Sequence, residues 1–312
     1  MCGVQTSRMT KPNSENYLAA ILFVAGSTAL FSFQYATGKL TGNFYSPYQI
    51  LFLRYVSGFA VVSFLVALHA VPVLRVSPRR LATHAARAAC GSLGGVCTIQ
   101  ATALMPVVDA SAIGLTEGFL TVILGIVFLG ELVTARHWRA IAICGAGAAI
   151  VAFGNGAFAG GPALDRAYLA AAGLAFLGAL LIAFESVLIR LLSLAERPLS
   201  VLFFVNFFGM LIMAAPALAN WQGGLSVSAL AFLALGPFAI FAQYLTILGF
   251  RRAPISVVGP VTYSWIIFGG FIGLVFFGEI PTGVTLAGSI LIVAGGVLLA
   301  RLPADKAKAA QA

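Results

Sequence analysis

Charged residues are scarce in this sequence, and their scarcity excludes an ordinary soluble protein. Only 9% of the 312 residues are Asp, Glu, Lys or Arg, whereas 61% are hydrophobic. Typical soluble domains carry about 25% charged residues. The mean hydropathy of +1.02 points the same way. We therefore expect an integral membrane protein whose main partner is the lipid bilayer.

Residues that bind metals and nucleotides are also few. The chain has three histidines and four cysteines, and no group of them has the spacing of a metal site. No glycine-rich phosphate loop follows a strand, and no apolar core of a cleavable signal peptide precedes Tyr17. We therefore expect no enzyme, no metal and no cofactor, and we expect the first apolar segment to be retained.

Long apolar runs, in contrast, recur from Tyr17 almost to the C-terminus. A helix needs roughly 20 apolar residues to cross a hydrocarbon core about 30 Å thick. Continuous runs favour helices over barrel strands, because barrel strands alternate polar and apolar residues. The runs predict an all-α protein with ten membrane spans, near 17–38, 47–68, 82–104, 107–129, 138–158, 168–190, 199–219, 226–249, 255–277 and 282–302.

The basic residues orient these spans. If the N-terminus is cytoplasmic, every Lys and Arg except Lys39, Arg54 and Arg166 falls in or beside a cytoplasmic segment, Arg87 included. By the positive-inside rule, both termini are then cytoplasmic, and we expect a multi-pass protein of the plasma (inner) membrane. The formal net charge of +9 is explained by this topology, so no nucleic-acid partner is expected.

The chain also repeats itself. Glu279 lies 148 residues after Glu131, and the same shift aligns residues 98–152 with 246–300 without a gap. The motif "YLAA" at Tyr17 returns at Tyr168, a shift of 151. The sequence therefore predicts two five-helix units: a cytoplasmic segment 1–16, a first repeat 17–158, a second repeat 166–302 and a cytoplasmic tail 303–312.

Five helices is an odd number, so consecutive units must insert with opposite orientations. Such inverted repeats are common in secondary transporters, where two similar halves exchange roles around a midplane site. The loops agree, because Glu131 is followed by Arg136 and Arg139 and the segment after Glu279 has lost its basic residues. We interpret the two glutamates as structural residues at the ends of helices on opposite membrane interfaces.

Two five-helix units, each with a Gly-Glu pair ending its fourth helix and a glycine-rich fifth helix ("AIAICGAGAAIVAFG" and "LAGSILIVAGGVLLA"), resemble the EamA-type transporters of the drug/metabolite transporter superfamily. The resemblance covers residues 17–302. It implies a ten-helix secondary transporter, often an exporter of amino acids or related metabolites. It also implies a central cavity lined mainly by spans 1, 3, 4, 6, 8 and 9, with spans 5 and 10 at the periphery.

Three ionisable residues inside the expected spans are candidates for the site, because an ionisable residue in a span costs about 2.5 to 3.5 kcal/mol unless it faces a partner or a cavity. Glu117 is ten residues into its span, about 15 Å deep at 1.5 Å per residue. It is a candidate for binding substrate or a coupling proton, or else a structural carboxyl group. Arg54 is placed either to pair with Glu117, to bind an anion or to reach the outer interface. Glu185, shortly before Arg190, either lines the cavity or belongs to the cytoplasmic interface.

Uncharged polar residues extend the candidate site. Gln34 and Glu185 occupy matching positions in the two repeats, so they are candidates for polar gates at opposite mouths of the cavity. Gln100, Gln243 and Tyr244 are candidates for lining it, although hydrogen bonding between helices explains them equally well.

Tyr263 and Trp265 stand opposite the segment around Glu117 in the repeat alignment. An aromatic wall facing a carboxylate would suit a cationic or zwitterionic solute, although packing also explains both residues. Pro237 and Pro260 are expected to kink the eighth and ninth spans and are candidate hinges.

We therefore expect alternating-access transport of a small organic molecule, with export of amino acids or related compounds as the leading hypothesis. Import of a vitamin or nucleoside-like metabolite by the same fold remains an alternative. A third possibility is a membrane scaffold subunit that transports nothing. A monomer and a homodimer are equally compatible with the sequence.

Overall fold

The chain is helical throughout the part that the computed structural model describes, which comprises residues 14–41, 46–72, 76–105, 107–154, 166–222, 232–278, 280 and 282–301. No strand occurs in these ranges. The first repeat contains α1 (Ser14–Thr41), α2 (Pro47–Leu68), α3 (Pro78–Leu104), α4 (Val107–Gly114), α5 (Thr116–Leu129) and α6 (Ala135–Gly154). The second contains α7 (Arg166–Ala195), α8 (Pro198–Ala219), η2 (Phe232–Ala234), α10 (Leu235–Arg252), α11 (Ile255–Val258), η3 (Gly259–Ser264), α12 (Trp265–Phe277) and α13 (Gly283–Ala300).

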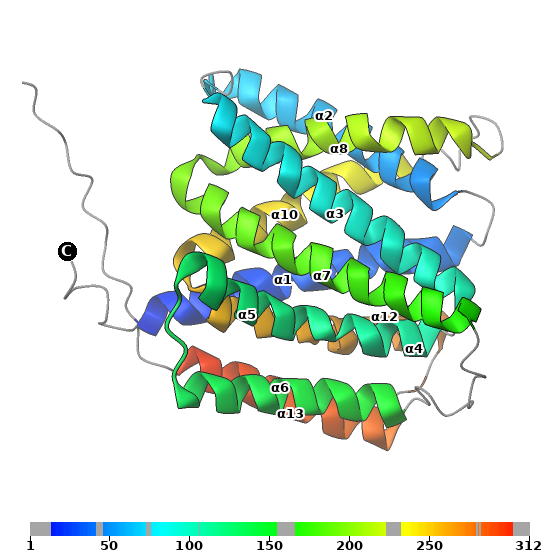
Figure 1. The fold of residues 1–312 in the computed structure, drawn as a ribbon, viewed down its shortest axis with the longest axis vertical. Coiled ribbons are helices and arrows are strands. Elements are labelled where there is room, and N and C mark those ends of the chain that lie inside the picture. Colours follow the sequence, from blue (N-terminus) through cyan, green and yellow to red (C-terminus); the bar gives the residue numbers. More distant parts are fainter. Residues whose placement is uncertain are drawn as a thin grey trace, which may run out of the picture.

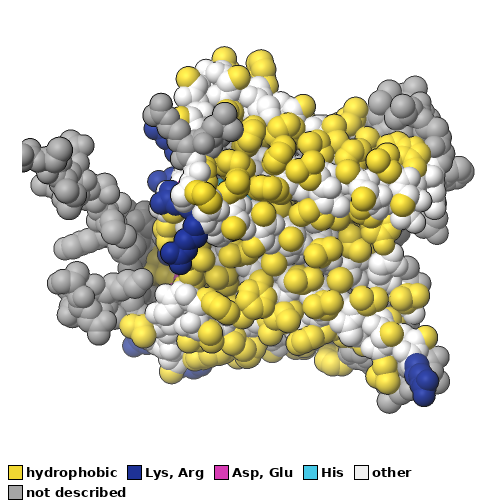
Figure 2. Space-filling model, turned by 45° about the horizontal axis from the view of Figure 1, so that its top comes forward, with side chains coloured by type: hydrophobic (Ala, Val, Ile, Leu, Met, Phe, Trp, Pro, Cys, Tyr) yellow, Lys and Arg dark blue, Asp and Glu magenta, His cyan; other side chains and the backbone are white. Residues whose placement is uncertain are grey.

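Eight helical stretches in the described residues are long and apolar enough to cross a membrane. They are Tyr48–Leu68, Ala112–Leu129, Ala135–Gly154, Arg166–Ala195, Pro198–Ala219, Phe232–Arg252, Ile255–Phe276 and Gly283–Ala300. The other two expected spans are α1, with the shorter apolar stretch Tyr17–Phe33, and the more polar α3. Figure 2 shows hydrophobic side chains over the flank of the bundle and Lys and Arg side chains mainly at one end. The molecule has the surface of a multi-pass membrane protein.

The sequence repeat is also a structural repeat. Shifted by 151 residues, α2 coincides with α8 at both bounds, and shifted by 148 residues, α5 and α6 fall on α12 and α13. Equivalent helices run in opposite directions, so that α1 begins at the end of the bundle where α7 ends (Figure 1). We call the end where α1 begins and α13 ends the terminal face.

The largest interfaces join one repeat to the other. They pair α3 with α7, α13 with α6, α1 with α10 and α2 with α8, as a two-fold axis between the repeats requires. Figure 1 places α6 and α13 at one edge, α2 and α8 at the opposite edge, and α1, α3, α5, α7, α10 and α12 between them. The peripheral position of α6 and α13 agrees with the arrangement that the family resemblance implies for spans 5 and 10.

Two of the expected spans are broken at matching places. The fourth divides into α4 and α5 at Leu115, and the ninth runs through α11, η3 and α12. Pro260 lies at the start of η3, so the expected interruption at this proline is present. Pro237 differs, because it lies in the first turn of α10 after η2. It begins a helix and does not bend a helix interior.

The Gly-Glu pairs end helices because their glycines adopt the left-handed conformation. Gly130 has φ of 62° and Gly278 has φ of 67°, values at which a side chain is strained. The N–H of Gly130 donates to the carbonyl of Ile126 (3.2 Å) and the N–H of Glu131 to that of Gly125 (3.3 Å). This C-cap satisfies carbonyls that the helix end would leave free.

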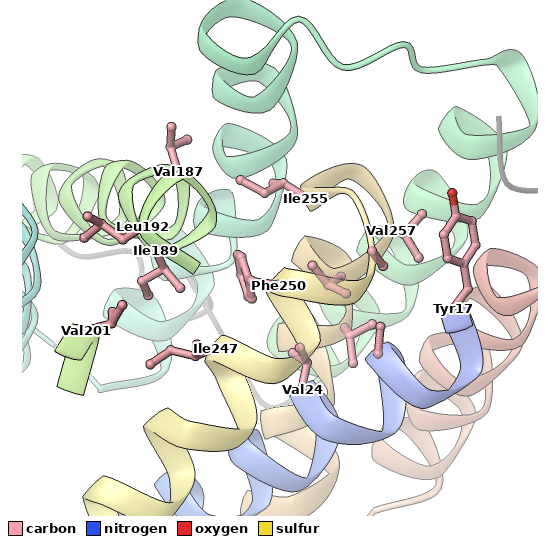
Figure 3. Close-up of a cluster of buried hydrophobic side chains, with 14 of the residues drawn as sticks. Tyr17, Val24, Val187, Ile189, Leu192, Val201, Ile247, Phe250, Ile255 and Val257 are labelled. Carbon is pink, nitrogen blue, oxygen red and sulfur yellow. The ribbon is translucent and has the colours of Figure 1, made fainter. Parts of the chain in front are cut away.

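The largest cluster of buried apolar side chains extends to the terminal face. There the ends of α7 and α10 meet the starts of α1, α8 and α11 (Figure 3). The cluster includes Tyr17, Val24, Val187, Ile189, Leu192, Val201, Ile247, Phe250, Ile255 and Val257. The clusters described nearer the other end of the bundle are smaller. The terminal face is therefore tightly packed in this structure.

Glycine contacts hold α6 against α13, and they generate a stability prediction. A Cβ atom on Gly147 would lie 2.6 Å from the carbonyl oxygen of Gly288 and 2.9 Å from the amide nitrogen of Ile292. We expect Gly147→Ala to lower the free energy of unfolding by about 1 to 3 kcal/mol through overpacking, measured by denaturation in detergent. Gly145→Ala is the matched control, because no atom lies within 4 Å of its Cβ position. Equal effects of the two substitutions would contradict a close glycine contact.

Candidate functional site

An ion pair inside the bundle joins the two repeats. Arg87 on α3 and Glu185 on α7 lie 3.6 Å apart between Nε and Oε1, with side chains 1% and 18% exposed. Nη1 of Arg87 also donates to the carbonyl of Val201 (3.3 Å). An unpaired charge inside the membrane is costly. Each of the two side chains therefore supplies the opposite charge that stabilises the other.

Glycines make room for this pair. A Cβ atom on Gly91, one turn after Arg87, would lie 2.5 Å from Oε2 of Glu185. Further along the same interface, a Cβ on Gly94 would lie 3.3 Å from the carbonyl oxygen of Gly178. The glycines of the motif "GSLGG" therefore let the two helices pack closely. The first of them also leaves the space that the Glu185 carboxylate occupies.

Arg54 on α2 adds a second positive charge. Its guanidinium lies over the ring of Tyr55, 4.4 Å from the centroid, and it makes no ion pair with another described residue. Its Nε is buried without a hydrogen-bond partner among those residues, and its charge acts on Glu185. The Tyr55 hydroxyl accepts a hydrogen bond from Ser92 (3.1 Å). The Arg54 guanidinium therefore stacks on an aromatic ring, and its Nε donor has no partner among the described residues.

Glu117 lies where both broken spans meet. It is in the first turn of α5, immediately after the break at Leu115, and it is partly exposed. Across from it, Tyr263 of η3 is buried against Gly118, where a Cβ would lie 2.7 Å from the Tyr263 Cζ. Glu185 is close enough to act on Glu117 electrostatically. No ion pair joins Glu117 to Arg54 in the described residues, so the expected direct pair is not formed in this structure.

A groove of about 260 Å³ opens beside this break. Leu115, Thr116 and Phe119 line it from the fourth span, Gly145 lines it from α6, and Tyr263 lines it from η3. The lining is mostly apolar, with a tyrosine and a threonine as its polar members. Broken membrane helices are tolerated where they line a cavity or lie within the protein, and both conditions apply here.

Two of the candidate glutamines lie elsewhere in the bundle. Gln100 donates through Nε2 to the hydroxyl of Tyr48 (2.6 Å), which joins α3 to α2. Gln243 on α10 is buried, and its Oε1 has no hydrogen-bond partner among the described residues. Gln100 therefore has a structural contact, whereas Gln243 retains an unused acceptor.

The remaining candidate site residues are Tyr244, Trp265 and Gln34. Tyr244 and Trp265 are exposed, and the backbone carbonyl of Trp265 accepts a hydrogen bond from Ser32 (3.4 Å). The side chain of Gln34 lies outside the described residues, so its pairing with Glu185 as opposite gates stays a prediction. The structure brings together Arg54, Glu117, Glu185 and Tyr263 from the expected set.

Arg87 is the site residue that sequence reasoning missed. The positive-inside pattern predicts a cytoplasmic anchor at this position, but the Arg87 side chain is almost completely buried and paired within the bundle. Rules based on charge counts treat an arginine near a span end as an anchor. The available signal was its place inside the apolar run 82–104, one turn before Gly91.

The EamA-like transporter family model matches residues 18–153 and again residues 169–301. The chain belongs to the EamA-like transporter family. The resemblance drawn from the Gly-Glu pairs and glycine-rich helices is thereby confirmed, as is the expectation of a membrane transporter and not an enzyme. Two matches within one chain also agree with the two structural repeats.

Named relatives of this EamA-like protein move different solutes. It is 25% identical over 288 residues to the pseudopaline exporter CntI of Pseudomonas aeruginosa in each of two strains, covering 91% of this chain and 96% of the exporter. It is 27% identical over 228 residues to a riboflavin transporter of Rhizobium johnstonii, covering 70% of each chain. A solved crystal structure matches with a TM-score of 0.75 at 22% identity over 89% of this chain and 95% of that one, which shows a shared fold.

The Arg87–Glu185 pair generates the second prediction. We expect Arg87→Gln and Glu185→Gln each to lower the free energy of unfolding by about 3 to 5 kcal/mol, because each leaves a buried charge without its partner. The double variant should lose much less than the sum, which a double-mutant cycle in detergent measures.

A second pair provides the control for that cycle. Arg80 and Glu196 are 3.9 Å apart, and the Arg80 side chain is 54% exposed. We expect Arg80→Gln to change stability by less than about 1 kcal/mol. Strictly additive losses for Arg87 and Glu185 would show that the two side chains are not coupled.

Proposed function

We propose that this EamA-like protein is a secondary active transporter that moves a small organic metabolite by alternating access. Its two halves are related by inversion and pack against each other, with four large interfaces between them. Ionisable residues from both halves meet between them at the breaks of the fourth and ninth spans. Inverted repeats with discontinuous helices at the midplane are the arrangement that alternating access uses.

We further propose ten spans, with the terminal face in the cytoplasm of a cell bounded by the plasma (inner) membrane. The 27 residues of α3 extend about 40 Å at 1.5 Å per residue, enough to cross a bilayer. Exposed arginines at helix ends on the terminal face support this orientation under the positive-inside rule. They are Arg79, Arg80, Arg136, Arg139, Arg251, Arg252 and Arg301. On this topology, segments 1–16 and 303–312 are cytoplasmic and the repeats are 17–158 and 166–302.

The observation that carries the substrate proposal is the pair of unpaired charges near Glu185. Arg54 acts electrostatically on Glu185, and Glu185 acts on Glu117, yet neither Arg54 nor Glu117 has an ion-pair partner among the described residues. A substrate with both a carboxylate and an ammonium group would complement the two, with Tyr263 beside it. This chemistry favours amino acids or related compounds.

The names of the relatives bear on the direction of transport and on the substrate. The Pseudomonas aeruginosa relative is named as an exporter, which supports export as the leading proposal. The Rhizobium johnstonii relative is named as a riboflavin transporter, which keeps a vitamin as the second candidate substrate. A scaffold without transport would have no use for unpaired charges inside the membrane, and these are costly.

The substrate proposal is tested by counterflow in proteoliposomes with labelled amino acids, vitamins and nucleosides. We expect amino acids to exchange in the parent protein. Glu117→Gln should slow this exchange by about tenfold or more and flatten its pH dependence, because the variant loses one charged contact and one titratable group. Unchanged rate and pH dependence would remove Glu117 from the site.

Arg54→Gln is the matched variant for the other end of the substrate. We expect it to impair solutes that carry a carboxylate and to spare their decarboxylated amines, whereas Glu117→Gln should spare the deaminated acids. If the folded parent protein exchanged no solute of the panel, the scaffold alternative would replace transport. If both variants impaired all solutes alike, the zwitterion proposal would be lost.

A further inference from the structure

The glutamate of the first Gly-Glu pair holds the start of a helix in the other repeat. Oε1 of Glu131 accepts the N–H of Ile255 (2.8 Å), and Oε2 accepts the N–H of Ser256 (2.9 Å). These two amides open α11, the first piece of the broken ninth span. A single carboxylate therefore joins the end of α5 to a segment 124 residues away.

The local sequence leaves these amides free for such a partner. Pro254 precedes α11, and its side chain offers no capping acceptor. A carboxylate is the preferred partner at a helix start, because the amides there are unpaired and carry partial positive charge. Gly130, in the left-handed conformation, turns the chain back so that Glu131 reaches α11.

A second contact holds the same corner from the other side. Arg190 on α7 donates to the backbone carbonyl of Phe250, near the end of α10, and it is within electrostatic reach of Glu131 and Tyr17. The segment 250–256, which we call the α10–α11 corner, is therefore tied to α5 by Glu131 and to α7 by Arg190. Phe250 and Ile255 of this corner are buried in the apolar core of the terminal face (Figure 3).

We propose that Glu131 is a latch whose two hydrogen bonds hold the terminal face closed and release when that face opens. The inference rests on the proposed alternating access, which requires contacts between the repeats at each face to break in turn. Apolar packing closes the face, and the carboxylate fixes the position of the corner within it. Entering water can replace both hydrogen bonds, so release exposes no unsatisfied polar group.

A fixed helix cap would have the same geometry but different consequences. Removing a fixed cap lowers the stability of the folded protein without favouring either face. Removing a latch shifts the population toward the state open at the terminal face, by about tenfold or more for a charge-assisted hydrogen bond. The two roles therefore differ in accessibility and in the affinity measured from each side of the membrane.

Accessibility is measured with a cysteine at Val257, which is 0% exposed and lies in α11 directly after the latched amides. In inside-out vesicles, a membrane-impermeant maleimide reaches the proposed cytoplasmic face. We expect Glu131→Gln and Glu131→Ala to accelerate labelling of Val257→Cys by about tenfold. Vesicles with the parent chain lacking the reporter correct for the native cysteines.

The matched control is Glu196→Gln. Glu196 is a second acid of the terminal face, but it contacts His84 (2.9 Å) and Arg80 (3.9 Å) on α3 and not the α10–α11 corner. We expect this variant to leave Val257→Cys labelling within about twofold of the parent. Equal acceleration by Glu196→Gln would overturn the latch, because any lost acid at this face would then have the same effect.

Substrate affinity gives an independent readout. The latch predicts that Glu131→Gln raises apparent affinity at the terminal face and lowers it at the opposite face, whereas a fixed cap changes neither. Unaltered labelling together with a lower unfolding temperature would establish a fixed cap and overturn the proposal. If Glu131→Ala does not fold, Glu131→Gln alone distinguishes the latch from the fixed cap. This variant keeps one acceptor oxygen for the α11 amides. Counterflow by the parent protein tests transport separately, so the two proposals fail in different measurements.

Discussion

A backbone amide inside a membrane must find its partner within the protein, and the structure is organised around this constraint. Intact helices meet it by themselves, which is why most of the chain is helical. The fourth and ninth spans break, and their breaks lie between the repeats, where Tyr263, Gly118 and Glu117 meet. At the start of the ninth span the missing partner is the Glu131 carboxylate. The irregular backbone and the ionisable residues therefore occur together.

Inversion decides which residues become neighbours. Because equivalent helices run in opposite directions, α3 of one repeat packs against α7 of the other, and Arg87 meets Glu185 across that interface. Gly91 and Gly94 let these helices approach closely enough for the pair to form. The same geometry brings the end of α5 to the beginning of α11. The Arg87–Glu185 pair and the Glu131 contact with α11 are therefore both contacts between the two halves.

Sequence patterns predicted the parts of this fold that depend on local composition. The run 47–68 and its counterpart 199–219 begin beside prolines and correspond closely to α2 and α8. The repeat and the family followed from Gly-Glu spacing, and Glu117 and Arg54 were found because charge in an apolar run is costly. The break at Leu115, in contrast, leaves hydropathy unchanged, whereas the break in the ninth span had Pro260 as its signal. The contacts of Arg87 and Glu131 with residues far away in the sequence could not be predicted. No local sequence pattern indicates which segment packs against a helix end.

The partner of Glu131 is backbone, and this has an evolutionary consequence. Any residue except proline at positions 255 and 256 supplies the same two amides, so substitutions there leave the contact intact. Comparison of related sequences for pairs of positions that change together would therefore not reveal this contact. Its only visible trace in a family would be a glutamate that keeps its identity without any accompanying change elsewhere.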